Sequence, residues 1–136
     1  MPFWKCYFHV IWTTKHRQRL IAPRLEPIIF DAIATKVHEF DSRLLGINAV
    51  EDHVHVALMI PPGVAPAELI GQTKGLSSHA VNLAIEGKER FRWQEGYGIL
   101  TFGEKNLDFV LRYIADQKTH HASGKIQPRL ELTNDD

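Results

Sequence analysis

The segment "EDHVHVALMIPP", residues 51–62, is the most informative part of the sequence, because it shows where a strand begins, how its two faces differ and where it ends. Side chains two residues apart on a strand point to the same face. His53 and His55 are therefore predicted to lie side by side, and Val54, Val56, Leu58 and Ile60 to face the other way. The two prolines that follow end the strand. The pattern predicts a buried strand that carries a pair of histidines.

The remainder of the chain alternates between strand and helix patterns around this strand. Further strands are predicted over residues 6–14, 46–50 and about 97–102, with the histidine strand over 53–60. Helices are predicted over residues 25 to about 43, 66 to about 85, and 106–121, the last ending at Gly124. The order β-α-β-β-α-β-α predicts an α+β, ferredoxin-like antiparallel sheet with helices mainly on one face. Residues 1–136 are expected to form a single domain, with a C-terminal tail from about residue 125.

Composition limits the class of protein. Of the 136 residues, 44% are hydrophobic, which allows one packed core. The 16 Lys and Arg balance 16 Asp and Glu, so the net charge is zero; this disfavours non-specific coating of nucleic acid but allows a local basic groove. Cys6 is the one cysteine, which excludes an internal disulfide and a Cys-based zinc site. No apolar run reaches the ~18 residues of a membrane helix, so we expect a cytoplasmic protein without membrane contact.

The histidine pair and the last predicted helix together suggest a metal site. Neutral imidazoles bind divalent metals, but a site needs a third ligand. At 100° per residue, Tyr113, Gln117 and His120 fall on one flank of the helix's apolar stripe. Tyr113 is a potential nucleophile and Gln117 offers an oxygen to a hard cation; taken in isolation, a half-buried tyrosine and a solvated glutamine are the more common situation. Asp52 is expected to shape the turn or to orient a histidine from behind, and His120 to support the site.

Basic and aromatic residues interleave in "TTKHRQR" and in "RFRWQ". Rings that stack on unpaired bases, beside cations that contact phosphates, are typical of surfaces that bind single-stranded nucleic acid. Ordinary loop or edge structure is the alternative for both stretches, and helix packing is the alternative for "QTKGLSSHAVN". The candidate DNA-binding residues are Arg17, Arg19, Lys74, Arg90, Arg92 and Trp93.

Five pieces of the sequence, taken in order, resemble one known family. They are "YFHVIWTTKHR", "DHVHVALMIPP", "KGLSS", "FRWQEGYG" and "YIADQKTHH", and they run from about Tyr7 to His121. Together they resemble the insertion-sequence transposases that act on single-stranded DNA, and their REP-associated tyrosine transposase relatives. These are the small single-tyrosine HUH endonucleases, named for the His-hydrophobic-His motif.

The resemblance implies a role for each matching residue. His53 and His55 match two ligands of a Mg²⁺ or Mn²⁺ ion, Gln117 matches the third ligand, and Tyr113 matches the nucleophile, with no carboxylate needed among the ligands. The implied activity is metal-dependent cleavage and rejoining of single-stranded DNA at hairpin-marked element ends through a 5′-phosphotyrosine intermediate. The implied assembly is a homodimer, in which some members use the tyrosine helix of the partner subunit. Two alternatives stay open: a non-catalytic or domesticated DNA-hairpin-binding protein on the same fold, and a small histidine-metal enzyme unrelated to DNA.

Overall fold

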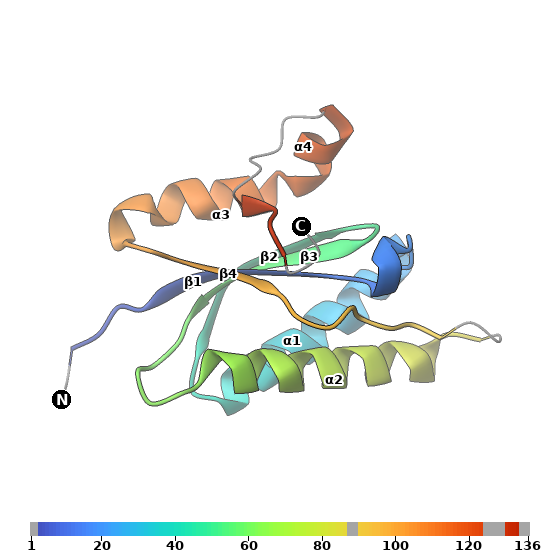
Figure 1. The fold of residues 1–136 in the computed structure, drawn as a ribbon, viewed down its shortest axis with the longest axis horizontal. Helices are drawn as coiled ribbons and strands as arrows, with labels where there is room; N and C mark the ends of the chain where they lie inside the picture. Colours follow the sequence, from blue (N-terminus) through green and yellow to red (C-terminus); the bar gives the residue numbers. More distant parts are fainter. Residues whose placement is uncertain (1–2, 87–89, 124–129, 134–136) are drawn as a thin grey trace.

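A computed structural model describes residues 3–86, 90–123 and 130–133, with the backbone alone at 120, 122 and 123 (Figure 1). Within these residues four strands form one antiparallel sheet in the order β2-β3-β1-β4. The strands are β1 (Tyr7–Thr13), β2 (Arg43–Val50), β3 (His53–Met59) and β4 (Gly98–Phe102). The helices are α1 (Glu26–Glu39), α2 (Pro66–Ala84), α3 (Leu107–Ala115) and α4 (Gln117–Ser123). The predicted ferredoxin-like α+β fold is confirmed.

The helices form two layers, one on each side of the sheet, instead of lying mainly on one face as expected (Figure 1). The two long helices, α1 and α2, cover one face, and α3 and α4 lie across the other. On the face of α1 and α2, Val54 and Val56 join the main hydrophobic core with Ile29 and Ile33. On the opposite face Ala57 packs with residues of α3. The alternation predicted for β3 is confirmed, because Val54, Val56 and Leu58 enter the main core while His53 and His55 belong to the face of α3 and α4.

Helix α1 ends earlier than residue 43, which was the predicted end. Asp41 adopts a left-handed backbone with φ of 55°, a conformation in which aspartate is tolerated better than most side chains. The amide of Ser42 then donates to the carbonyl of Val37, and the amide of Asp41 to that of His38, both at 3.0 Å. This pattern of hydrogen bonds closes the helix terminus, and Arg43 is therefore the first residue of β2 instead of the last of the helix.

The single helix predicted over residues 106–121 is two helices. The break falls at Asp116, which has φ of −96° and ψ of 15°. Asn48 of β2 donates its side-chain amide to the carbonyls of Ile114 and Ala115, both at 3.0 Å, and so occupies oxygens that a continuous helix would pair with later amides. The predicted terminus at Gly124 lies outside the described residues.

Residues near the C-terminus return to the sheet. The tail was expected from about residue 125; residues 124–129 lie outside the described part, but Leu130 to Thr133 line the surface of β4 beside His9. Among the described helices, none has the length and apolar character needed to cross a membrane.

Candidate active site

The histidine pair lies on β3, a central strand that pairs with β2 on one side and β1 on the other. In β3, His53 is opposite Thr13 of β1 and Val50 of β2, while His55 is opposite Ile11 and Asn48. His53 is 3% exposed and His55 is 0% exposed. Strand pairing on both sides fixes the backbone of both residues, so their side chains project from a rigid base.

Each imidazole has a second residue in contact with its Nδ1 atom. His53 Nδ1 lies 2.6 Å from Asp52 Oδ1, and because a carboxylate only accepts, Nδ1 carries the proton and Nε2 keeps its lone pair. His55 Nδ1 lies 2.8 Å from His9 Nε2, with the two rings stacked. His9 can either donate or accept there, so His55 can also present a free lone pair at Nε2. Asp52 thus lies where the sequence placed it, while His9 was missed.

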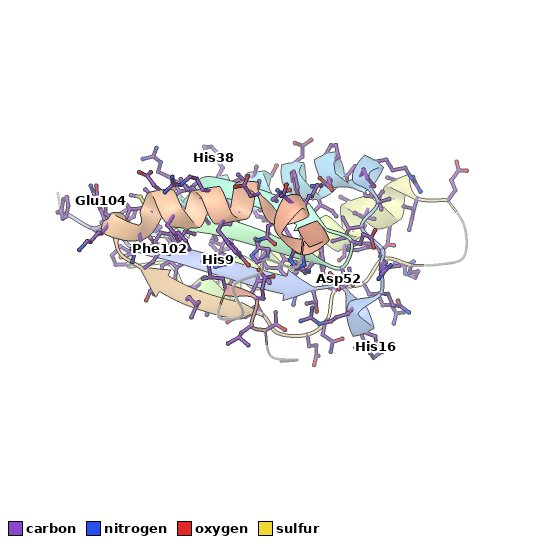
Figure 2. The ribbon with its side chains drawn as sticks, turned by 90° about the horizontal axis from the view of Figure 1, so that it is seen from above. His9, His16, His38, Asp52, Phe102 and Glu104 are labelled. Atoms are coloured by element: carbon purple, nitrogen blue, oxygen red, sulfur yellow. The ribbon has the colours of Figure 1, made fainter. Side chains whose placement is uncertain are left out.

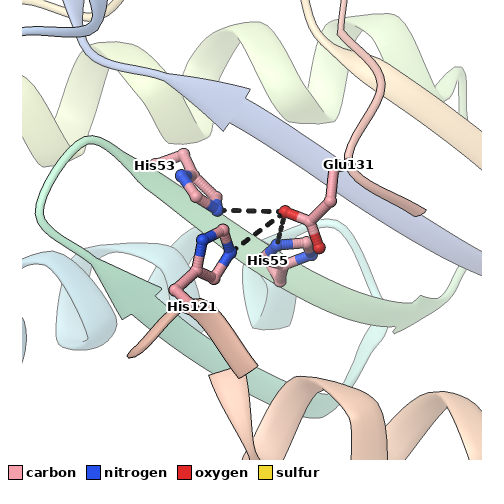
Figure 3. Close-up of side chains that lie close together, drawn as sticks. All are labelled: His53, His55, His121 and Glu131. Atoms are coloured by element: carbon pink, nitrogen blue, oxygen red, sulfur yellow. Dashed lines mark hydrogen bonds and ion pairs between the residues drawn. The ribbon is translucent and has the colours of Figure 1, made fainter. Parts of the chain in front are cut away.

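Two further side chains complete the cluster (Figure 3). Glu131 Oε1 lies 3.2 Å from His53 Nε2, 3.0 Å from His55 Nε2 and 3.3 Å from His121 Nε2. Figure 3 shows that these three contacts meet at one carboxylate oxygen of Glu131. Two of the imidazoles come from β3 and the third comes from α4. One possible ligand atom from each of the four residues lies within 4.8 Å of the others.

Tyr113 and Gln117 reach the same place from the helices above. Tyr113 on α3 donates its hydroxyl to Glu131 Oε2, and its ring lies edge-on to that of His55. Gln117, at the start of α4, is 0% exposed, so the alternative of a solvated glutamine is wrong. Its Nε2 donates to the Tyr113 carbonyl at 3.2 Å, and its Oε1 accepts from His121 Nε2 at 3.0 Å. The predicted residues Tyr113, His53, His55 and Gln117 are therefore gathered on one face of the sheet, while the side chain of His120 lies outside the described part.

The pKa values of this cluster follow from burial and from its two carboxylates. Burial lowers the pKa of His9 to about 3, with a further contribution from His55, so His9 is neutral. Burial by itself would lower the pKa of His53, but the contacts with Asp52 and Glu131 outweigh it and raise that pKa above its ordinary value. Burial likewise opposes ionisation of Glu131, yet its close contacts with the His53 and His55 imidazoles hold its pKa far below the usual range. The site therefore keeps a carboxylate ionised next to the imidazoles.

The donor set fits a divalent cation. Among the described residues His53 Nε2 is one of three buried side-chain polar atoms without a hydrogen-bond partner, since Glu131 lies close to it but outside hydrogen-bond geometry. A metal-ligating histidine usually has one nitrogen bound to a carboxylate and the other nitrogen buried and free for the metal.

Figure 2 views the sheet from the side of α3 and shows where the residues behind the two imidazoles lie. His9 is near the middle of the sheet, and Asp52 is toward the end that leads to His16.

Most of the predicted DNA-binding arginines lie beside this site. Arg19, Arg90 and Arg92 line a cavity of about 820 Å³ with Lys15. Arg19 also lines a neighbouring cavity that contains Asp52 and His121, so the two cavities adjoin at Arg19. Arg17 Nη1 lies 4.0 Å from Asp52 Oδ2.

The other two predicted DNA contacts are engaged within the protein. Lys74 Nζ donates to the carbonyls of Gln94 and Gly96, both at 2.7 Å. Trp93 donates Nε1 to Ser77 Oγ at 2.9 Å, and its ring meets those of Trp12 and Phe91 edge-on. This geometry favours a role for both residues in holding residues 93–96 against α2.

The sequence contained weak signals for the three residues that were missed. His9 lies on the same predicted strand face as Ile11 and Thr13, so a polar residue at a buried position was visible but had no assigned partner. His121 is part of the quoted "YIADQKTHH", one position beyond His120. Glu131 had no signal, because it lies in the stretch expected to be a tail.

Comparison with known proteins identifies the class. Residues 2–117 match the family described as "Transposase IS200 like". The transposase for insertion sequence element IS200 of Salmonella typhimurium LT2 is 27% identical over 128 residues, covering 90% of this chain and 83% of that protein. The ISDra2 transposase TnpA of Deinococcus radiodurans is 24% identical over 115 residues, covering 81% and 82%. The chain is therefore a transposase, a class of DNA-processing enzyme, and it belongs to the IS200-like family.

Two solved structures share the fold. A protein of Deinococcus radiodurans R1 described as a transposase superposes with a TM-score of 0.69 at 21% identity, covering 85% of this chain and 93% of that one. A REP-associated tyrosine transposase bound to a REP hairpin superposes with a TM-score of 0.65 at 16% identity, covering 86% and 68%. The resemblance stated from the five sequence pieces is thereby confirmed at the level of family and fold.

Proposed function

We propose that this chain is a metal-dependent, single-tyrosine endonuclease and strand transferase that acts on single-stranded DNA at hairpin-marked element ends. The observation that carries the proposal is the position of the Tyr113 hydroxyl, which is one hydrogen bond away from the carboxylate that contacts His53 and His55. The candidate nucleophile and the candidate metal-ligating imidazoles therefore contact the same carboxylate group, that of Glu131. In an IS200-like transposase, such a meeting point suits attack on a phosphodiester.

The proposed ligands are His53, His55 and Gln117, with Mg²⁺ or Mn²⁺ as the cation. His53 Nε2 is supported by its missing hydrogen-bond partner and by Asp52 at its other nitrogen. Gln117 is supported by full burial next to the cluster and by the proton of His121, which orients its oxygen. When bound, the cation would polarise the scissile phosphate and offset the charge that develops on it.

In the proposed reaction Tyr113 Oη forms a bond to phosphorus and the bond from phosphorus to the 3′ oxygen breaks. The phenol loses one proton and the departing 3′ oxygen gains one, so the step is balanced without an external reagent. The 5′ phosphate stays on the tyrosine, and attack by another strand's 3′ hydroxyl reverses the step and joins the strands without ATP. A phenol has a pKa of about 10 and is a weak nucleophile at neutral pH. A cation beside it would stabilise the deprotonated form, which is the stronger nucleophile.

The basic cavity lined by Lys15, Arg19, Arg90 and Arg92 is the proposed entry of the DNA backbone. Its continuity through Arg19 with the cavity that contains His121 supports a path from hairpin to reaction centre. A DNA hairpin as partner is supported by the structural neighbour bound to a REP hairpin. We also propose a homodimer, as the family resemblance implies, which sedimentation equilibrium would test.

The proposal is tested by a denaturing gel with end-labelled, hairpin-bearing single-stranded oligonucleotides from the flanks of the gene. With Mg²⁺ or Mn²⁺ we expect a protein–DNA adduct that disappears in Tyr113→Phe and in His53→Ala, while hairpin binding in a mobility shift stays within about twofold. An adduct in Tyr113→Phe would remove that residue as the nucleophile. Hairpin binding without an adduct under either metal would favour the non-catalytic hairpin-binding alternative.

A further inference from the structure

We propose that Glu131 is itself a ligand of the cation, and that its second carboxylate oxygen holds the Tyr113 hydroxyl toward it. The inference rests on the proposed function, because it adds one residue to the metal site described there. Neither the periodicity nor the resemblance assigns any role to Glu131. The carboxylate would join nucleophile and cation through one rigid group.

The first support is the spacing of the donor atoms. Glu131 Oε1 lies 3.0 Å from His55 Nε2 and 3.2 Å from His53 Nε2. Ligand atoms about 2.1 Å from an octahedral cation lie about 3 Å from their neighbours. The carboxylate oxygen is therefore as far from each imidazole nitrogen as adjacent ligands of one cation are from each other.

The second support is the chemistry of the donors. Two imidazoles and one amide form an uncharged set, and imidazole nitrogens suit zinc better than magnesium or manganese. One carboxylate gives the site a negative charge and a hard oxygen, which Mg²⁺ and Mn²⁺ prefer. With His53, His55, Gln117 and Glu131 as ligands, two octahedral positions remain for a phosphate oxygen and a water molecule.

The third support is that the segment carrying Glu131 packs closely against the sheet at Gly98. The carbonyl oxygen of Leu132 lies directly over Gly98 of β4, where any Cβ atom would overlap it. Leu130 and Leu132 line the surface of β4 beside His9. The Glu131 side chain is only 12% exposed, because it turns from this segment into the cluster. Glycine at position 98 thus permits the close approach that brings the carboxylate to the histidines.

The test is Mn²⁺ binding to the full chain without DNA, measured from the free-ion signal in electron paramagnetic resonance. We expect Glu131→Gln, which keeps the shape and removes the charge, to weaken Mn²⁺ binding at least tenfold. Glu104→Gln is the matched control: Glu104 is an exposed glutamate paired with Lys5, so the same loss of one charge should leave the affinity unchanged within twofold. Tyr113→Phe should also leave the affinity unchanged within about threefold, because the hydroxyl contacts the carboxylate and not the cation. Circular dichroism melts would verify that each variant is folded.

The outcomes separate this inference from the proposed function. Unchanged Mn²⁺ affinity in Glu131→Gln, together with a loss in His53→Ala, would overturn the role of Glu131 and leave the metal site standing. Tighter binding in Glu131→Gln would also overturn it, since the carboxylate would then be competing with the cation. Absence of Mn²⁺ binding by the wild-type chain would overturn both.

Discussion

At the scale of single residues, the site depends on which nitrogen of each imidazole is free. Asp52 binds Nδ1 of His53 at 2.6 Å and leaves Nε2 facing the cluster. Partners of this kind change metal affinity by about 10- to 100-fold when they are removed. We therefore expect Asp52→Asn to weaken Mn²⁺ binding about tenfold, measured by isothermal titration calorimetry, because an amide fixes the imidazole less firmly than a carboxylate does.

Its neighbour Glu51 provides the control for Asp52. Glu51 is exposed and pairs with Arg19 at 3.4 Å, so Glu51→Gln removes one negative charge from the same turn without touching an imidazole. Equal losses of affinity in the two variants would show that general electrostatics, and not the orientation of His53, explain the effect.

His9 gives the site a pH dependence in the metal-free protein. Its folded pKa of about 3 lies below the ordinary value of 6.5, so between these two pH values the unfolded chain binds more protons than the folded one. The contribution of His9 to stability is therefore expected to fall as the pH falls through this window, by roughly 2 kcal/mol between pH 6.5 and 5. We expect urea unfolding in EDTA to show that His9→Gln, which does not titrate, loses less stability than the wild type over this range. Parallel losses in both proteins would contradict the assignment.

At the scale of elements, the contact between β4 and residues 130–133 is open to a direct test. A methyl group at position 98 would overlap the Leu132 carbonyl and lie 2.9 Å from Ile11 Cγ2. We expect Gly98→Ala to displace this segment and to weaken Mn²⁺ binding in the same direction as Glu131→Gln. Gly103→Ala is the control, because a Cβ at Gly103 meets no atom within 4 Å. Wild-type affinity in Gly98→Ala would show that the segment does not position a ligand.

The same scale shows where prediction from sequence succeeded and failed. Periodicity located every strand and long helix to within a few residues, since it records which face of an element is buried. It missed the break at Asp116, because that break depends on hydrogen bonds from Asn48, which lies 66 positions away from Ile114 in sequence. Despite the break Tyr113 and Gln117 still meet, because Gln117 donates to the Tyr113 carbonyl across it.

At the scale of the whole molecule, the described residues bring Tyr113, Gln117 and the histidine pair together within one chain. Both helices are tied to β2, the strand next to the histidine strand, in the same chain: Asn48 donates to carbonyls at the end of α3, and Lys118 of α4 donates to the Ala49 carbonyl at 3.0 Å. If the protein is a dimer, we expect each subunit to use its own Tyr113. A mixture of Tyr113→Phe and His53→Ala chains, unfolded and refolded together, should then form no adduct on the labelled hairpin. Restored adduct formation would mean that the tyrosine acts in the partner subunit.

The strand that carries His53 and His55, the order of strands and helices, and the helix flank that holds Tyr113 and Gln117 could all be read from local periodicity. These are properties of neighbouring residues. The surroundings of the histidine pair became known from the folded structure alone, because those contacts join distant parts of the chain. His9 meets His55 across 46 positions and Glu131 meets it across 76. Strand register and the close packing of Leu132 on Gly98 create these contacts. Neither feature produces a periodic pattern in the sequence.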